Sequence, residues 1–178
     1  MNRLLKKVAA AAAWGWAGAI ALGMVCHLAG ARINTSRSIP LGLYWTSSAP
    51  VEKGAYVLFC PPSTGVFDEA KKRGYLAAGF CAGDFGYMMK RVLGVANDSV
   101  EVTDLGVLVN HRLLAFSAPR QHDLFARPLP RYEPRSFKLT RSQLLLMSDV
   151  SETSFDARYF GPVEQAQIRS VIVPVWTW

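Results

Sequence analysis

The chain has 178 residues, of which 51% are hydrophobic and 19% are charged. This length suits one domain with a substantial core, and the composition excludes a disordered, collagen-like or coiled-coil protein. The formal net charge is +7, but three cations lie in the first seven residues, which leaves only +4 for the rest. Because that remainder has no basic run beyond Lys71-Lys72-Arg73 and no recognised binding module, we expect no nucleic-acid partner.

The first 31 residues predict a membrane anchor. Residues 8–31 carry no charged side chain, and a helix of that length rises roughly 36 Å, enough to cross a hydrocarbon core of about 30 Å. The basic leader, residues 1–7, is expected to stay in the cytoplasm, which sends residues 32–178 across the membrane as an exported domain. The alternative is a cleaved secretory signal ending near Ala29-Gly30-Ala31, although the apolar run is longer than a usual signal core.

The exported domain is predicted to be mainly antiparallel β. Turn residues alternate with short runs that favour strands, at 54–60, 87–95, 99–102, 106–110, 112–116, 143–148 and 170–176. Asp104-Leu105-Gly106 and Asn110-His111 indicate two successive hairpins. Residues 61–84, with one helical turn at 68–73, and residues 117–136 are expected to be irregular. The apolar C-terminal run, 171–178, is either a closing core strand or a membrane-touching surface.

The cysteines allow a disulfide in the exported domain. Cys60 and Cys81 would close a loop of about 20 residues in an oxidising compartment, and two free thiols are the alternative. Cys26 lies within the apolar run, where it is most simply a small apolar residue. The sequence holds no CxxC pair or Cys/His cluster that indicates zinc, so we expect no metal and no cofactor.

The three histidines are poor candidates for acid-base chemistry. His27 lies in the apolar run, His111 in a predicted turn and His122 in a proline-rich loop. A Ser-His-Asp triad is therefore not indicated, and another side chain would have to activate a nucleophile.

Ser38 lies in a segment that can present a hydroxyl group. Pro40 fixes its own φ and biases Ile39 away from the helical region, so the backbone that follows Ser38 is expected to be extended or turning. The alternative is an ordinary loop serine.

Lys90 is a candidate base. In a strand it shares a face with Met88 and Val92, while Arg91 faces the other side, so one of the two cations must lie against apolar neighbours. A desolvated lysine can lose about 3 to 5 pKa units and become a neutral amine, whereas arginine stays charged. The alternative is a lysine whose stem follows the strand edge and whose amine stays in water.

A third segment contains Ser154, Asp156 and Arg158. If residues 154–158 are extended, these three side chains project to one side. The functional interpretation places Ser154 or Asp156 beside the amine of Lys90. The structural alternative is an ion pair between Asp156 and Arg158, with a solvated serine.

Together, the three segments resemble the boxes of the type I signal peptidases, which use a Ser/Lys dyad. The resemblance is closer to the TraF branch, the conjugative transfer signal peptidases that process pilin precursors. It covers nearly the whole chain, including the N-terminal anchor and the region of Cys60 and Cys81. The matching segments are SIPLGLY at 38–44, KRVLG at 90–94 with Asp98 beyond, and SFDARYFGP at 154–162.

The resemblance implies a catalytic role for several of these residues. Ser38 would be the nucleophile and Lys90 the general base, with Ser154 positioning the lysine. Asp156 and Arg158 match the acidic and basic partners of the family, and Asp156 counts among the catalytic residues of this branch.

The resemblance also implies an oxyanion hole, formed in part by the backbone NH of Ser38 and by the hydroxyl of Ser36. Two positions depart from the pattern. Ala157 replaces a serine common in general signal peptidases, and Asn97 replaces a glycine before Asp98. Asparagine tolerates a left-handed turn, so that bend can survive.

The implied protein is a membrane-anchored serine endopeptidase that forms an acyl-enzyme. It would lie in the bacterial inner membrane, with a periplasmic catalytic domain, and process a membrane-inserted pilin precursor for plasmid transfer. Either water or an amine could resolve the acyl-enzyme, so hydrolysis and joining of the pilin ends into a ring both stay open. The expected partners are the pilin precursor, inner-membrane lipid and other components of the conjugation machinery. The alternative is a noncatalytic, membrane-anchored assembly component.

Overall fold

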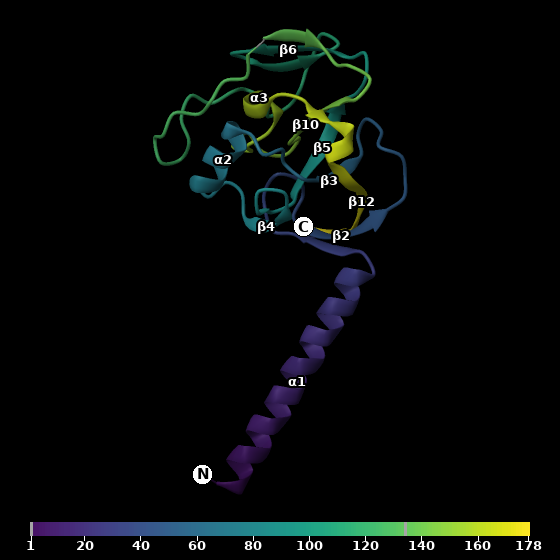
Figure 1. Ribbon diagram of the computed structural model, residues 1–178, viewed down its shortest axis with the longest axis vertical. Helices are drawn as coiled ribbons and strands as arrows, with labels where there is room; N and C mark the ends of the chain where they lie inside the picture. Colours follow the sequence, from purple (N-terminus) through teal and green to yellow (C-terminus); the bar gives the residue numbers. More distant parts are fainter. Residues whose placement is uncertain (1, 134) are drawn as a thin grey trace. The chain divides into compact units, whose positions relative to one another are not determined.

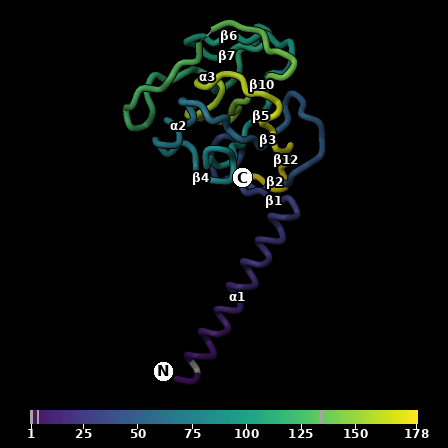
Figure 2. The backbone as a smooth tube through the Cα atoms, in the orientation of Figure 1, coloured from purple at the N-terminus to yellow at the C-terminus, as the bar shows by residue number. Residues whose placement is uncertain are grey.

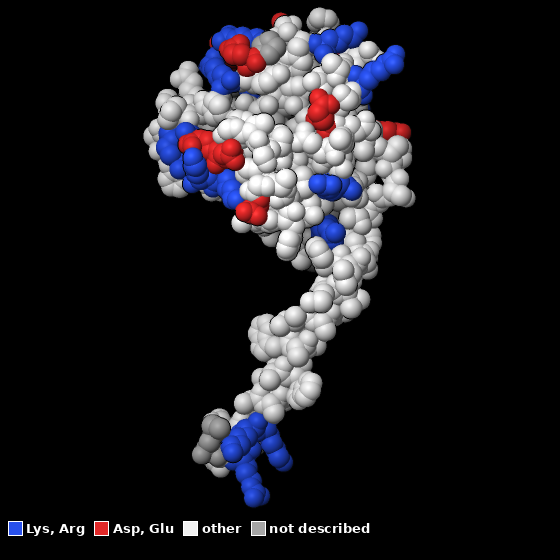
Figure 3. Space-filling view, viewed as in Figure 1, with Lys and Arg blue, Asp and Glu red and all other residues white. Residues whose placement is uncertain are grey.

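The computed structural model describes residues 2–133 and 135–178, and the chain divides into two units, residues 1–32 and 33–178 (Figure 1). The first unit contains helix α1 (Arg3–Leu28), which Figure 2 traces as one continuous helix. Its segment Leu5–Leu28 is long and apolar enough to cross a membrane. On the face shown in Figure 3, basic side chains gather at the start of α1 and are absent along the rest of it. The helix is consistent with a membrane anchor.

The second unit is built on two antiparallel sheets. Their strands pair in the orders β1-β2-β12-β3-β5-β10-β11 and β8-β7-β6-β9, and the pairings from β2 to β11 and throughout the second sheet are antiparallel. The larger sheet contains β1 (Ala31–Asn34), β2 (Gly42–Ser47), β3 (Tyr56–Phe59), β5 (Met88–Gly94), β10 (Gln143–Met147), β11 (Val163–Glu164) and β12 (Ile168–Thr177). The smaller sheet contains β6 (Ser99–Thr103), β7 (Gly106–Val109), β8 (Arg112–Leu113) and β9 (Ser136–Lys138).

The remaining elements are short. They are α2 (Gly65–Lys72), β4 (Ala78–Cys81), α3 (Ala157–Phe160) and the 3-10 turn η1 (Gln165–Gln167). A disulfide joins Cys60, just after β3, to Cys81, at the end of β4, with 5.5 Å between their Cα atoms. It closes a loop that contains α2, and a closed loop of this length stabilises a fold by about 3 kcal/mol in the chain-entropy model.

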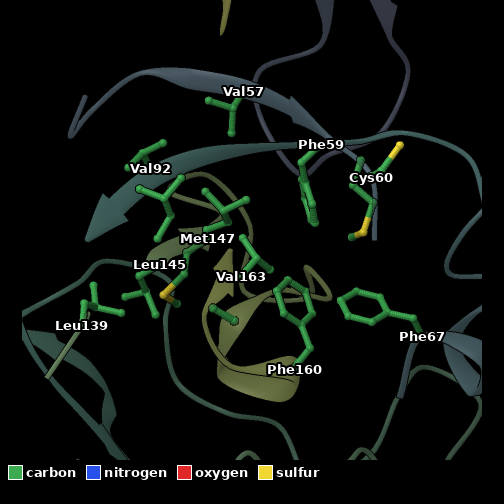
Figure 4. Packing of buried hydrophobic residues seen from close by; sticks show 14 of the residues in the cluster. Val57, Phe59, Cys60, Phe67, Val92, Leu139, Leu145, Met147, Phe160 and Val163 are labelled. Carbon is green, nitrogen blue, oxygen red and sulfur yellow. The ribbon is translucent and has the colours of Figure 1, made fainter. Parts of the chain in front are cut away.

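The main core joins buried residues of the larger sheet, of the helices α2 and α3, and of β6 and β7 in the smaller sheet (Figure 4). Phe59 of β3 and Val92 of β5 are completely buried there. Phe160 of α3 packs between Phe59 and Phe67 of α2, at ring-centroid distances of 6.3 Å and 4.8 Å. Burying a side chain of this size contributes roughly 1.5 to 3 kcal/mol. This core holds α3, and the segment before it, against the strand β10.

The opposite face of β3 is covered as well. Leu58 points away from Phe59 because successive side chains of a strand alternate. It packs in a second, smaller cluster with Ile39, Tyr44 and Ile172, all of which are buried. The segment that carries Ser38 is therefore fixed to the sheet through its neighbour Ile39.

The prediction of a mainly antiparallel β domain after a long apolar helix is confirmed. All seven predicted strands are present, one of them shortened, and the left-handed residues Asn110 and His111 form the turn of the second hairpin. Asn97 also has a positive φ, of 70°, so the bend before Asp98 survives without glycine. The C-terminal run is a sheet strand, β12, between β2 and β3, although its last residues are exposed.

Other predictions were wrong in detail. The strand predicted at 112–116 ends at Leu113, because the chain turns at Phe116, whose φ is 54°. The predicted helical turn at 68–73 is the longer helix α2, and the strands β1, β2, β4, β9 and β11 were not predicted. Residues 154–158 are not extended throughout, since α3 begins at Ala157 and the side chain of Asp156 caps it.

Candidate active site

Lys90 lies at the centre of the larger sheet. In β5 buried and half-buried residues alternate, and Lys90 falls on the buried face with Met88 and Val92. It pairs with Val57 on the neighbouring strand β3 and is only 1% exposed. Its Nζ atom lies 2.7 Å from Ser38 Oγ and 2.6 Å from Ser154 Oγ. The structure thus brings Ser38, Lys90 and Ser154 together.

Burial lowers the pKa of Lys90 from its ordinary value of 10.5 to about 8. The charge of Asp156 opposes this shift and the charge of Arg158 adds to it. Both hydrogen-bond partners of the amine are neutral hydroxyl groups, so no direct contact with a carboxylate offsets the loss of hydration. The site therefore favours the neutral amine more than bulk water does, and a neutral amine can accept a proton.

Asp156 and Arg158 form an ion pair behind the amine. Both side chains are completely buried, and the guanidinium donates from Nε and Nη2 to the two carboxylate oxygens at 2.7 Å and 2.8 Å. The carboxylate also accepts from the backbone NH of Ser148 at 3.1 Å. Because the carboxylate oxygens of Asp156 already accept these hydrogen bonds, Asp156 acts on Lys90 through its charge. The hydroxyl of Ser154 is the group that contacts the amine.

Arg158 also links two loops that flank the site. Its Nη1 atom donates to the backbone carbonyls of Ala118 and Glu152, each at 3.1 Å. A buried ion pair that lost one partner would leave an uncompensated charge, so Asp156 and Arg158 depend on each other. The ion pair between Asp156 and Arg158 that the structural alternative predicted is present. Ser154 beside it, however, is buried rather than solvated.

Asn34 fixes the loop that carries Ser38. This side chain is 3% exposed, and its Nδ2 atom lies within hydrogen-bonding distance of three backbone carbonyls, those of Ser36 at 2.8 Å, Ile39 at 2.9 Å and Pro40 at 3.0 Å. Its Oδ1 atom accepts from the backbone NH of Ser36 at 3.1 Å. One buried amide therefore holds both sides of Ser38, which is itself only partly exposed.

Ser36 is oriented by the same amide. Its hydroxyl donates to Asn34 Oδ1 at 2.9 Å, so a contact with an oxyanion would require that hydrogen bond to be exchanged. Sequence reasoning missed Asn34 altogether. An asparagine before a serine-rich loop is common, and only the fold reveals that its amide is buried against the loop it precedes.

A cavity of about 300 Å³ opens beside Ser38 and Ser154. Its walls come from the end of α2, from residues 120–125 of the proline-rich loop and from the segment 151–155. The lining residues are Arg37, Ser38, Arg73, Gly74, Tyr75, Arg120, His122, Asp123, Leu124, Phe125, Leu129, Ser151, Thr153, Ser154, Phe155 and Tyr159. The described residues contain no group of three His, Cys, Asp or Glu side chains placed to hold a metal ion.

Comparison with known proteins identifies the family. Residues 5–178 match the family described as signal peptidase, peptidase S26. The chain therefore belongs to this signal peptidase family, and the resemblance read from three short segments is confirmed.

The similar proteins narrow the group further. A plasmid transfer protein TraF from Escherichia coli is 60% identical over the full length of both chains. A conjugal transfer protein TraF from Agrobacterium tumefaciens is 36% identical over 84% of each chain. A crystal structure of a signal peptidase I from Enterococcus faecalis covers 71% of this chain and 100% of its own, with 16% identity and a TM-score of 0.43. Within its family the chain belongs to the TraF branch.

The lowered pKa of Lys90 predicts a pH-dependent stability. The unfolded chain keeps the Lys90 proton up to about 10.5 and the folded chain only up to about 8, so between these values the unfolded state binds more protons and stability rises with pH. Relative to a Lys90→Met variant, the wild-type chain should gain about 2 to 3 kcal/mol of unfolding free energy between about pH 8 and pH 10. Denaturant titrations in detergent at several pH values measure this, and a constant difference would contradict it.

The Asn34 hydrogen bonds predict a graded loss of stability. Asn34→Ala removes all contacts of the amide and leaves buried carbonyls unpaired, which should cost about 2 to 4 kcal/mol. Asn34→Asp keeps the acceptor for Ser36 but turns a buried carboxylate oxygen toward the three carbonyls, so it should cost at least as much as Asn34→Ala. Ser36→Ala removes one part-buried hydrogen bond of an exposed residue and should cost less than about 1 kcal/mol. Unfolding curves for the three variants test the order, and equal effects of Asn34→Ala and Ser36→Ala would refute the assigned role.

Proposed function

We propose that this chain is a membrane-anchored serine endopeptidase with a Ser/Lys dyad, in which Ser38 is the nucleophile and Lys90 the general base. The observation that carries the proposal is the 2.7 Å approach of a buried amine with a lowered pKa to the hydroxyl of Ser38. A serine hydroxyl is a weak nucleophile until a neighbouring base removes its proton, and histidine is not the only side chain able to do so. Membership of the signal peptidase family supports the same assignment.

The first half of the reaction forms an ester. Neutral Lys90 takes the proton from Ser38 as the serine oxygen bonds to the scissile carbonyl carbon. The carbon–nitrogen bond then breaks, and the protonated amine passes the proton to the leaving nitrogen. The backbone NH of Ser38 is the donor we assign to the oxyanion. The products of this half are an acyl-enzyme on Ser38 and a free amine.

The second half releases the acyl group. A water molecule that gives a proton to Lys90 attacks the ester and yields a carboxylic acid, which is hydrolysis. If the amine of another residue of the substrate attacks instead, the product is a new amide and the overall step is transpeptidation. In both routes Ser38 recovers its proton through Lys90, so the same dyad serves either outcome.

Three residues support the dyad in this proposal. The hydroxyl of Ser154 fixes the Lys90 amine through a second hydrogen bond, at 2.6 Å. Asp156 provides a compensating negative charge close to the lysinium that forms during the reaction, and Arg158 holds Asp156 in place. Asp156 thus stabilises the charged intermediate state without preventing deprotonation of the free enzyme.

The proposed substrate and location follow from the relatives. Plasmid transfer proteins of the TraF branch are the similar proteins at the highest identity reported above, and we infer that the substrate is a membrane-inserted pilin precursor. We place the chain in the bacterial inner membrane, with residues 1–7 in the cytoplasm and residues 32–178 in the periplasm. The disulfide between Cys60 and Cys81 suits an oxidising compartment.

The proposal predicts that pilin maturation depends on the dyad. The mass of the candidate pilin should fall when it is produced with the wild-type chain, and processing should drop by at least about 1000-fold with Ser38→Ala or Lys90→Met. Ser48→Ala and Lys138→Met alter an exposed serine and an exposed lysine and should process normally. Mass spectrometry of the pilin measures each result and also shows whether one further water is lost, the signature of ring closure.

Two outcomes decide against the proposal. If the pilin mass is the same with and without the wild-type chain, the pilin is not a substrate. If Ser38→Ala and Lys90→Met process pilin normally, the chain is a noncatalytic assembly component that recruits another peptidase.

A further inference from the structure

The cavity beside Ser38 has a positively charged rim. Arg37 and Arg120 line it and are exposed. Neither guanidinium lies within salt-bridge distance of a carboxylate among the residues that the structure describes. The third arginine of the lining, Arg73, is already paired with Glu69 at 2.7 Å. Two cations beside the nucleophile therefore remain available to a ligand.

Asp123, the carboxylate that lines this cavity, is committed elsewhere. Its Oδ1 atom accepts from the backbone NH groups of Phe125 and Arg127 at 2.8 Å and 2.9 Å. Its Oδ2 atom accepts from Arg127 Nε at 2.6 Å and from the hydroxyl of Tyr75. Burial would raise the pKa of Asp123, but these hydrogen bonds together lower it, so the carboxylate stays ionised and occupied by its own loop. It cannot neutralise Arg37 and Arg120 as well.

An aromatic row borders the charged rim. The ring of Phe155 lies between those of Tyr75 and Tyr159, at centroid distances of 5.6 Å and 5.8 Å. The hydroxyl of Tyr159 accepts from the backbone NH of Arg120 at 3.1 Å, which fixes the backbone of that arginine at the rim. Apolar walls shield a bound group from water, and an ion pair is stronger where water is excluded. The cavity therefore joins an apolar wall to unpaired cations.

We propose that this cavity is a substrate subsite for a carboxylate, held by Arg120 and Arg37 within a few residues of the scissile bond. Arginine is suited to this task because its planar guanidinium binds both oxygens of a carboxylate. A cavity of about 300 Å³ is the size of a small ligand site, large enough for one or two residues of an extended peptide. The carboxylate comes either from an Asp or Glu side chain or from the C-terminus of the substrate. The inference rests on the peptidase function proposed above and adds the chemistry of its substrate.

The test measures peptide binding to the full-length Ser38→Ala chain in detergent, so that it does not depend on turnover. The probes are capped octapeptides that carry Glu, Gln or Lys at each position in turn, and a Gln peptide with either a free or an amidated C-terminus. We expect the preferred acidic peptide to bind roughly three- to tenfold more tightly than its neutral counterpart. If a Glu peptide binds more tightly, the bound carboxylate belongs to a side chain. If the peptide with a free C-terminus binds more tightly, the bound carboxylate is the C-terminus of the substrate.

Variants of Arg120 at the cavity rim test whether this residue causes the preference for acidic peptides. Adding Arg120→Gln should remove most of the preference, and adding Arg120→Glu should reverse it in favour of a Lys peptide, a result that a merely structural role would not give. Arg141→Gln removes another exposed arginine, outside the cavity, and should keep the full preference.

Equal binding of acidic and neutral peptides at every position overturns the subsite. So does a preference that survives Arg120→Glu. These results leave the peptidase proposal intact, because processing of pilin is measured separately. Conversely, a carboxylate preference in a chain whose Ser38→Ala and Lys90→Met variants process pilin normally would retain the binding site and refute the peptidase assignment.

Discussion

The desolvation of one amine is the constraint on which the rest of this structure depends. Lys90 is placed by strand register on the buried face of an interior strand. Among the residues that the structure describes, its amine contacts two hydroxyl groups and no carboxylate. Had Asp156 paired directly with Lys90, the opposite charge would have kept the amine protonated. Instead, the guanidinium of Arg158 donates hydrogen bonds to both carboxylate oxygens of Asp156. The ion pair thus lets a negative charge stand near the amine without holding its proton.

The surrounding fold brings Ser38 and Ser154 to the amine of Lys90. The cluster around Ile39 anchors the segment of Ser38 on one side, and the amide of Asn34 ties together the carbonyls on both sides of it. On the opposite side, packing of Phe160 against Phe59 and Phe67 holds α3 and so positions the segment that begins at Ser154. Segments far apart in the sequence therefore meet at Lys90 because each is attached to the core independently.

Local patterns predicted much of this arrangement, and its limits have physical causes. Alternation grouped Lys90 with Met88 and Val92 without deciding whether Lys90 or Arg91 is the buried cation, and turn residues marked the hairpins, because both signals depend on nearby residues. The contacts of Asn34 and the cavity wall at residues 120–125 depend on tertiary packing, which no local pattern encodes. The helical turn at Ala157 was missed because a capping aspartate can equally belong to an extended segment. The sequence left open whether Ser154 or Asp156 touches the amine, and only the packing of α3 assigns that contact to Ser154.

The protonation state of Lys90 is the central claim, and an NMR titration of the full-length chain with ¹³C-labelled lysine tests it most directly. The Lys90 resonance, assigned by its loss in Lys90→Met, should titrate with a pKa of about 8. A Lys90 pKa at its ordinary value of 10.5 would contradict the account, because the amine would then be almost entirely charged at neutral pH and unable to accept the proton of Ser38.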